Sequence, residues 1–224
     1  MTLSEQLVRK VYDMTDKMQV EQVVVGPVST NCYIVIHKDT REAFVVDPGD
    51  YGEGLAAQLD KLGAKAVGIL LTHGHFDHAG AAEDLAKKYD IPVYAHMKEQ
   101  ETLENPMVNL SGNMMGNPKV YHADEFLRDQ QEFDLAGFHI RCLHTPGHTA
   151  GGCCYYIARE DVLFSGDSLF CGSIGRTDFP GGSAATLVNS VREKLMVLPE
   201  NTLVLPGHDA RTTIEQERMY NPFL

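Results

Sequence analysis

The chain has 224 residues, of which 43% are hydrophobic and 22% charged, which suffices for a buried core and excludes a disordered or fibrous protein. The 31 acidic residues outnumber the 19 basic ones and give a formal net charge of -12 at pH 7. Because an acidic surface repels phosphate backbones and the sequence contains no basic stripe, we expect no nucleic-acid partner.

The sequence also gives no sign of a membrane partner. The apolar run from Ala66 to Leu71 is far shorter than the ~20 residues that a membrane helix needs. Acidic residues interrupt the first twenty positions, where a signal peptide has an uninterrupted apolar stretch. We therefore expect a cytoplasmic protein.

The first predicted element is an amphipathic helix over residues 1–20. Thr2 and Glu5 match a capping box. Apolar residues then recur at spacings of three or four, at Leu3, Leu7, Val11, Met14 and Met18. We expect this helix to cover the core or to meet a partner, which leaves a homo-oligomer open.

Residues 21–224 are predicted to form a single domain, since no low-complexity segment or Pro/Ser-rich linker divides them. Short β-branched runs come first, and strands then alternate with helices in both halves. Two β-rich halves with helices outside predict an α/β sandwich. The main predicted segments are strands near 23–25, 33–36, 43–46, 66–72, 162–164 and 202–205, and helices at 55–62, 77–89 and 183–197, with a last short helix after Thr212.

The segment from Met97 to Lys119 lies between the two halves and is rich in Met, Asn and Gly. Such a composition is typical of a surface loop, and equally of a mobile flap over a site. Both interpretations stay open at this point.

The stretch Thr72 to His78 carries three imidazoles and one carboxylate directly after a predicted strand. In an extended turn His73 and His75 point to the same side and can share one metal ion. Asp77 and His78, in the first turn of the next helix, are displaced toward a second ion. Neutral imidazoles and carboxylates suit Zn²⁺, with Fe or Mn admissible. A solvated loop is the alternative, but buried groups of this kind are costly without partners.

Three further apolar runs each end in a turn of small residues with one metal-binding side chain. These side chains are His148 in HTPGH, Asp167 in SGD and His208 in PGH. Together with the first motif they make seven candidate ligands, enough for two divalent ions if one carboxylate bridges them.

The H-x-H-x-D-H motif with its later His, Asp and His resembles the metallo-β-lactamase superfamily, from about Val23 to His208. The resemblance implies a four-layer αββα sandwich. Asp47, in VVDPG, matches the superfamily's early Asp and is implied to hold the histidine loop in place, although an ordinary turn is the alternative. The implied ligand sets are His73, His75 and His148 for one ion, Asp77, His78 and His208 for the other, and Asp167 as the bridge.

The segment GSIGRTDFP, residues 172–180, resembles the glyoxalase II group, especially its short bacterial members, and also the persulfide dioxygenases. The first resemblance implies a hydroxyacylglutathione-type thioester as substrate and Arg176 as an anion-binding group. A surface pair with Asp178 is the alternative for this arginine. Only 16 residues follow His208, so we expect no separate C-terminal glutathione-binding domain.

The resemblance therefore implies a dinuclear metal-dependent hydrolase, in which a metal-bound hydroxide attacks a thioester carbonyl. Asp167 would bridge the ions and Asp77 could accept a proton from the water. An iron-dependent persulfide dioxygenase using His73, His148 and Asp167 alone is one alternative. A lactonase and a non-catalytic metal-binding module are the others. The remaining histidines are predicted to be structural, with His144 as a possible neighbour of the ligands.

Overall fold

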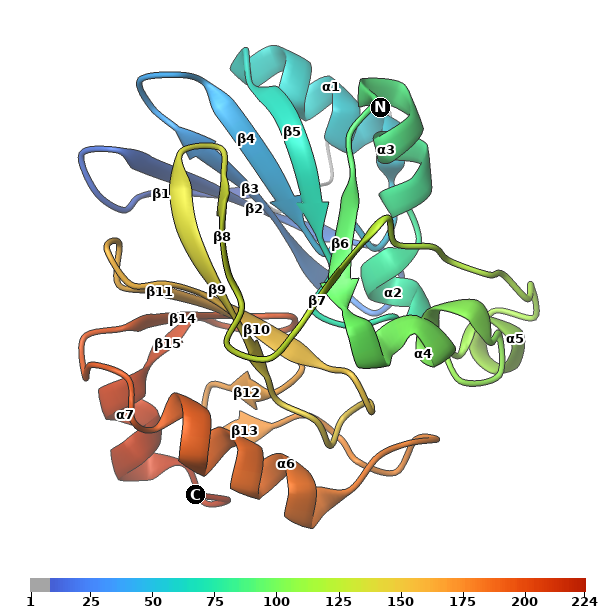
Figure 1. Cartoon of the computed structure of the whole chain (residues 1–224), viewed down its shortest axis with the longest axis vertical. Coiled ribbons are helices and arrows are strands. Elements are labelled where there is room, and N and C mark those ends of the chain that lie inside the picture. Colours follow the sequence, from blue (N-terminus) through green and yellow to red (C-terminus); the bar gives the residue numbers. More distant parts are fainter. Residues whose placement is uncertain (1–8) are drawn as a thin grey trace.

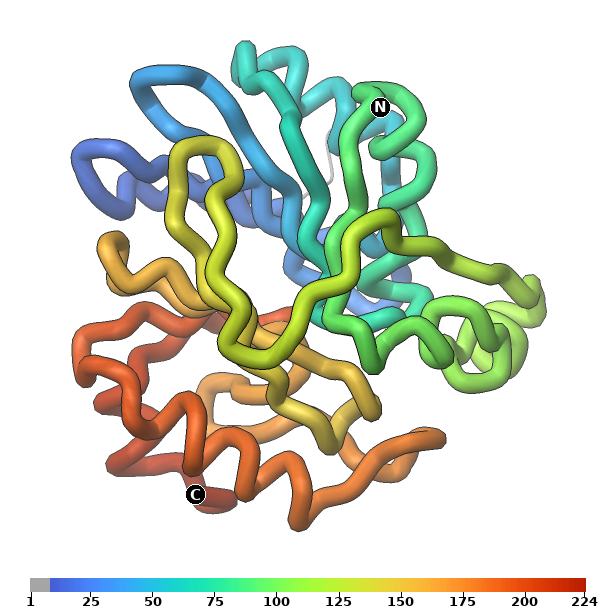
Figure 2. Tube along the Cα trace, in the orientation of Figure 1, coloured from blue at the N-terminus to red at the C-terminus, as the bar shows by residue number. Residues whose placement is uncertain are grey.

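The computed structural model describes residues 9–224. Two large β-sheets lie face to face, and helices cover the outer face of each (Figure 1). The blue-to-green part of the chain builds the first sheet, and the yellow-to-red part builds the second (Figure 2). The predicted four-layer αββα sandwich is confirmed.

The first sheet contains seven strands in chain order. They are β1 (Arg9–Asp13), β2 (Met18–Val25), β3 (Thr30–His37), β4 (Glu42–Val46), β5 (Lys65–Leu70), β6 (Val93–His96) and β7 (Glu125–Leu127). Strands β1 to β4 pair antiparallel, whereas β4 to β7 pair parallel. Since parallel strands end at the same edge of a sheet, the loops after β4, β5 and β6 are neighbours.

The second sheet has six strands and is accompanied by a small hairpin. The strands are β8 (Glu132–Leu135), β9 (Phe138–His144), β10 (Cys153–Ile157), β11 (Val162–Gly166), β14 (Leu203–Pro206) and β15 (Thr212–Thr213), with β12 (Leu169–Phe170) and β13 (Ser173–Ile174) in the hairpin. The order across the sheet is β15-β14-β11-β10-β9-β8, and only β11 and β14 pair parallel. Strands β9, β11 and β14 therefore run in the same direction.

The helices form two outer layers and a group near the site. The helical segments are α1 (Gly52–Leu62), α2 (Phe76–Ala79), α3 (Ala82–Tyr89), the 3-10 helix η2 (Met97–Glu99), α4 (Gln100–Glu104), α5 (Ser111–Met114), α6 (Ala184–Ser190), the π-helix η3 (Val191–Leu195) and α7 (Ile214–Tyr220). Helices α1 and α3 cover the first sheet, and α6 with η3 and α7 covers the second. Among residues 9–224, no helix combines the length and the apolar character needed to cross a membrane.

Alternation along the strands separates the apolar side chains into three cores. In β3, Tyr33 and Val35 point between the sheets, whereas Ile34 and Ile36 point toward α1 and α3. Both faces of this strand are buried, which explains its nearly continuous apolar sequence. Tyr155 of β10 enters the core between the sheets from the other side. The central core thus fixes one sheet against the other.

The predicted N-terminal helix over residues 1–20 is wrong where the structure describes it. Residues 9–13 and 18–25 form the antiparallel strands β1 and β2, and residues 1–8 lie outside the described part. The Thr15 hydroxyl accepts hydrogen bonds from the backbone N–H groups of Lys17 and Met18. These bonds stabilise the turn between β1 and β2. Apolar residues three or four apart fit a helix, but they also fit two strands joined by a turn. Pairing of these residues with the first sheet favours the two strands.

Two predicted helices are interrupted. The helix predicted over 77–89 divides into α2 and α3 at Gly80, where a Cβ atom would lie 2.2 Å from the carbonyl oxygen of Gly49. The backbone N–H of Ala81 donates to Pro48 instead of continuing the helix. The helix predicted over 183–197 changes from α6 to the π-helix η3 at Val191. The last helix begins after Thr213, whose hydroxyl accepts from the N–H of Gln216, rather than after Thr212.

Candidate metal centre

The seven predicted ligands come together because each follows the carboxyl end of a strand. The histidine motif follows β5, whereas His148, Asp167 and His208 follow β9, β11 and β14. The last three strands run in the same direction, so their loops meet at one edge of the second sheet. This edge faces the loop after β5, since the two sheets pack face to face.

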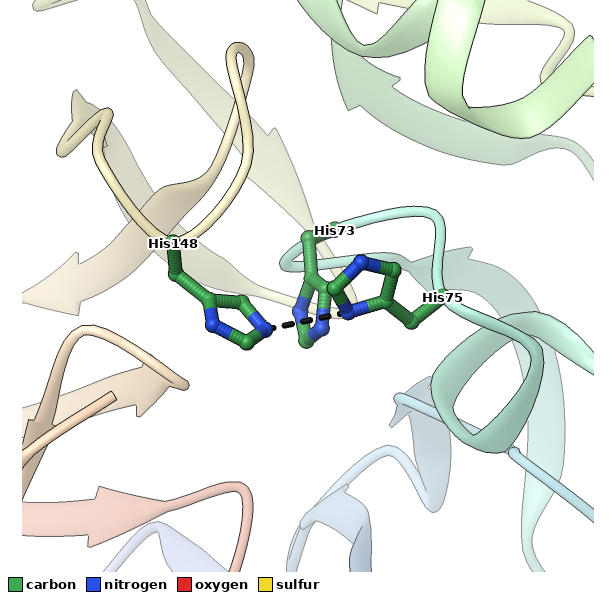
Figure 3. A group of neighbouring side chains, drawn as sticks. All are labelled: His73, His75 and His148. Carbon is green, nitrogen blue, oxygen red and sulfur yellow. Dashed lines mark hydrogen bonds between the residues drawn. The ribbon is translucent and has the colours of Figure 1, made fainter. Parts of the chain in front are cut away.

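Three imidazoles, those of His73, His75 and His148, converge in the first group (Figure 3). Nε2 of His148 lies 3.0 Å from Nδ1 of His75. The ring of His73 is 4.7 Å from that of His75 and 4.8 Å from that of His148. All three side chains are buried. The group therefore presents several nitrogen atoms toward one point, as a metal ion requires.

A second group consists of Asp77, His78 and His208. Oδ2 of Asp77 lies 3.4 Å from Nε2 of His78 and 3.3 Å from Nε2 of His208. The two imidazole Nε2 atoms are 3.4 Å apart. One carboxylate and two imidazoles thus point at a common position.

Asp167 lies between the two groups. Its Oδ2 is 3.5 Å from Nε2 of His148 and 3.6 Å from Nε2 of His208. Its Oδ1 is 3.5 Å from Nε2 of His78. A Cβ atom on Gly207 would lie 2.3 Å from Oδ1 of Asp167, so only glycine fits beside this carboxylate. The carboxylate reaches both groups at once.

Hydrogen bonds from outside the cluster orient two of the imidazoles. Nδ1 of His148 lies 2.7 Å from the carbonyl oxygen of Arg176 and must donate to it. Nδ1 of His78 lies 3.0 Å from Oδ2 of Asp47, which also accepts from the Thr72 hydroxyl. In the neutral form of each ring, which is the form that binds a metal ion, the lone pair is therefore on Nε2, the atom that faces the cluster. The Thr30 hydroxyl donates to Oδ2 of Asp77.

The electrostatics also differ between the groups. Burial, reinforced by neighbouring imidazoles, lowers the pKa of His73 and His75 well below its usual range, so both rings are neutral. Burial also acts against the charge on His78, but the surrounding carboxylates, Asp77 foremost, raise its pKa well above the usual range. The pKa of Asp77 lies well below its usual range because His78 and His208 outweigh the opposing effect of burial. The second group attracts positive charge.

Unpaired polar atoms show that the cluster fits metal ions. Nε2 of His73, Nε2 of His75 and Oδ1 of Asp167 are buried without a hydrogen-bond partner among the described residues. Such atoms are costly unless they bind something. Imidazole nitrogens and carboxylate oxygens are donors that suit divalent ions. The cluster therefore qualifies as a site for divalent metal ions.

A cavity of about 330 Å³ opens onto this cluster. Asp77, His148 and His208 contribute to its floor, and much of its wall is apolar. The apolar lining residues are Val28, Phe76, Leu110, Met114, Phe170, Ile174 and Phe179. Leu110 and Met114 belong to the Met97–Lys119 segment, which projects on one side of the sandwich (Figure 2). This segment thus forms part of the wall of the candidate site.

Arg176 lines the cavity and is also paired with a neighbour. Its Nε and Nη2 atoms donate to the carboxylate of Asp178 at 2.8 and 2.6 Å, and its guanidinium lies 4.1 Å from the centre of the Phe179 ring. The side chain is 59% exposed. Arg176 therefore forms the surface pair with Asp178 that was the alternative, and it also lies at the cavity, where its predicted role as an anion-binding group stays a prediction.

The other histidines lie away from the cluster, with surroundings of their own. His96 stacks on His144 with ring centres 4.0 Å apart, and Nε2 of His144 is bonded to the Ala150 carbonyl. His37 packs on Phe138, and the exposed His139 pairs with two acidic side chains. His122 lies on the surface.

The sequence interpretation missed Thr30, the apolar wall and Glu99. Glu99 ends η2 and is buried, with hydrogen bonds to the loops that carry the histidines. No strand was predicted before Glu99, and its place beside the histidine loop becomes visible only because β6 pairs parallel with β5.

Comparison with known proteins supports a common origin. A model of the family described as the metallo-beta-lactamase superfamily matches residues 25–208. The probable metallo-hydrolase YqgX of Bacillus subtilis is 41% identical over 208 residues, which are 92% of this chain and 98% of that protein. The hydroxyacylglutathione hydrolase GloC of Haemophilus influenzae is 37% identical over 213 residues, again 92% of this chain and 98% of that protein.

Solved structures agree with these relatives. The crystal structure of BLEG-1 B3 metallo-beta-lactamase is similar with a TM-score of 0.87 and 42% identity, and covers 91% of this chain and 98% of that one. The crystal structure of TTHA1623 in a di-iron-bound form is similar with a TM-score of 0.78 and 35% identity. The match covers 91% of this chain and 99% of that one. On the strength of the fold, the histidine and aspartate cluster and these similarities, the chain belongs to the metallo-beta-lactamase superfamily.

Proposed function

We propose that this chain is a dinuclear metal-dependent hydrolase that cleaves thioesters of the hydroxyacylglutathione type. The position of Asp167 carries the proposal, because its oxygens face His148 on one side and His78 and His208 on the other. A carboxylate in this place would ligate ions held by both groups, which suits a dinuclear centre. Asp77 and the three histidines of the first group complete the ligand set.

Two divalent ions, when bound, supply an activated water and polarise the carbonyl of the substrate. We propose zinc, because His73, His75, His78, His148 and His208 make the donor set rich in imidazole. Iron and manganese are the competing ions. The similar TTHA1623 was crystallised in a di-iron-bound form, so the identity of the metal needs measurement.

The remaining steps fall to residues at the cavity. Asp77 lines it with an ionised carboxylate and is the group that we propose to accept a proton from the attacking water. The apolar wall excludes bulk water and holds the carbon skeleton of the substrate. Arg176 is the cationic group at the cavity and is proposed to contact an anionic thiol portion.

The choice of a thioester is supported by the resemblance of residues 172–180 to the glyoxalase II group and by the name of the relative GloC. The name of BLEG-1 points instead to β-lactams. The proposed partner is therefore a small-molecule thioester, with β-lactams, lactones and persulfides as competing substrates.

The decisive experiment combines elemental analysis of the purified protein with assays on S-lactoylglutathione, a persulfide, a lactone and a β-lactam. Two ions per chain and preferential hydrolysis of the thioester support the proposal. One tightly bound iron together with oxygen consumption on the persulfide would establish the dioxygenase instead. Full metal loading without turnover of any of these compounds would favour a non-catalytic module.

A further inference from the structure

The carboxylate of Glu99 is buried between two of the loops that carry the candidate ligands. Its Oε1 accepts a hydrogen bond of 2.9 Å from the backbone N–H of Gly74, which lies between His73 and His75. Its Oε2 accepts from the hydroxyl of Thr149, the residue after His148, at 2.9 Å. The two oxygens thus hold different ligand loops.

A third donor strengthens the contact with the second loop. The backbone N–H of Gly151 donates to Oε2 of Glu99 at 2.8 Å. A Cβ atom on Gly151 would lie 2.2 Å from the backbone nitrogen of Glu99, so the loop can approach this closely only with glycine. A Cβ atom on Gly74 would lie 3.0 Å from Leu103, in the helix that follows Glu99. Both loops are therefore packed against the segment that carries the carboxylate.

The loops held by Glu99 belong to different sheets. Gly74 follows β5 of the first sheet, whereas Thr149 and Gly151 lie between β9 and β10 of the second. A small shift of one sheet against the other would change the distance between His148 and the pair His73 and His75. A carboxylate bonded to both loops opposes that shift.

The chemistry of the contact requires a carboxylate rather than an amide. Gly74, Thr149 and Gly151 all donate, and an ionised carboxylate is a pure acceptor with room for all three hydrogens. An amide at this position would turn an NH₂ group toward at least one backbone N–H. Burial raises the pKa of Glu99 to about 7, against the effect of Gly74 and the other donors. Burying a charged carboxylate is costly, and the three donors offset part of that cost.

We propose that Glu99 is a positioning residue that sets the separation between the His73–His75 loop and the His148 loop, so that the three imidazoles can share one metal ion. This role rests on the proposed metal centre and adds a residue that does not contact the ion. It acts through Gly74, Thr149 and Gly151.

Glu217 provides a matched control. It is also a buried glutamate, and it accepts hydrogen bonds from the backbone N–H of Gly172, the hydroxyl of Thr212 and the side-chain amide of Asn221. Its donors resemble those of Glu99, but none of them is adjacent to a candidate ligand. Glu217→Gln therefore removes a similar network without releasing the histidine loops.

The test compares Glu99→Gln with Glu217→Gln in the full chain. Metal-free protein is titrated with Co²⁺ and with Zn²⁺ against a competing chelator, the visible spectrum of the Co²⁺ form is recorded, and urea unfolding of the metal-free proteins is measured. We expect Glu99→Gln to weaken binding of one ion about 10- to 100-fold and to alter the Co²⁺ spectrum. Glu217→Gln should keep the affinity for each ion within twofold of that of the original protein and leave the Co²⁺ spectrum unchanged, even where it lowers the urea midpoint.

A milder variant covers the case in which Glu99→Gln fails to fold. Thr149→Val removes one donor to Oε2 while keeping the volume of the side chain, and should weaken the same ion a few-fold. Equal affinity and an unchanged spectrum in the Glu99 variant, or equal losses in the Glu99 and Glu217 variants, would overturn the proposal. An original protein that binds two ions but hydrolyses no thioester would contradict the proposed function alone, because the titration still measures the role of Glu99.

Discussion

Oδ2 of Asp47 lies 3.0 Å from Nδ1 of His78. The same aspartate accepts hydrogen bonds from the backbone N–H and the hydroxyl of Thr72, the residue before the histidine motif. In the neutral ring, which is the form that binds a metal ion, the proton on Nδ1 leaves the lone pair of His78 on Nε2, which faces Asp77 and Asp167. A buried residue outside the ligand set therefore fixes the ring orientation of a candidate ligand.

Replacing Asp47 by Asn tests this relationship. The amide NH₂ of Asn would face either a donor of Thr72 or the Nδ1 proton of His78, and one hydrogen bond would be lost. We expect the affinity for one of the two ions to fall roughly 10- to 100-fold, measured by chelator competition and elemental analysis. Asp134→Asn breaks a comparable pair with Nδ1 of the exposed His139 and should change nothing. Equal metal affinity in both variants would show that Asp47 does not orient His78.

Substitution of single histidines separates ligands from bystanders. His148→Ala and His208→Ala each remove one imidazole from the cluster, so both variants should lose bound metal and hydrolysis together. His139→Ala removes an exposed ring that pairs with two surface carboxylates, and should retain both properties. Elemental analysis beside a thioester assay provides the measurement. Full activity with two ions in His208→Ala would remove that residue from the second site.

The cluster could be predicted from the sequence because its ligands are close in the chain or follow apolar runs. His73, His75, Asp77 and His78 lie within six residues, and the strand before them already positions them. The sandwich was likewise predictable from the order of strands and helices. His148, Asp167 and His208 were recognisable because each ends an apolar run in a turn of small residues. The division of the seven ligands between two ions needed the resemblance to a family, since a single histidine or aspartate in a turn is common.

The N-terminal hairpin and the second layer of the site were not predictable in this way. Val11, Met14 and Met18 fit a helix by spacing, and only the pairing of β1 with β2 shows otherwise. The function of Glu99 depends on bonds to loops from two sheets. Such contacts join residues far apart in the chain and leave no periodic pattern.

Removal of the metal should lower the thermal stability of the protein. Without ions, the carboxylates of Asp77 and Asp167 lie close together, at 3.3 and 3.6 Å from Nε2 of His208. Nε2 of His73 and Nε2 of His75 have no hydrogen-bond partner within residues 9–224. Binding at 1,000 times Kd adds about 4 kcal/mol, which corresponds to roughly 10 °C in Tm for a domain of this size. Scanning calorimetry with and without chelator measures this shift, and His148→Ala should show a smaller one. An unchanged Tm in the original protein would argue against occupied sites.

Arg176 and Asp178 allow a test of substrate charge with opposite expected signs. Arg176→Ala removes the cationic group at the cavity but keeps the carbonyl that accepts from His148, so metal content should be retained while KM for an anionic thioester rises. Asp178→Ala frees the guanidinium from its carboxylate and should lower the same KM. Both changes should shrink at high salt, because the charges are exposed. Identical KM values in the two variants would remove Arg176 from substrate binding.

The apolar wall of the cavity predicts a preference for the size of the acyl group. Met114 lines the cavity from α5 and is 52% exposed, so Met114→Ala widens the cavity without opening a core. For thioesters of one thiol with acyl groups from lactoyl to hexanoyl, we expect kcat/KM to fall about 3- to 10-fold for hexanoyl, equivalent to about 0.6–1.4 kcal/mol of lost apolar contact. The lactoyl ester has fewer carbon atoms to place against Met114 and should change little. Met219→Ala removes a methionine of α7 that is 61% exposed and should leave the whole series unchanged. A uniform loss across all acyl lengths in Met114→Ala would mean that this wall holds the thiol portion instead, and a series unaffected by the substitution would place the substrate elsewhere in the cavity.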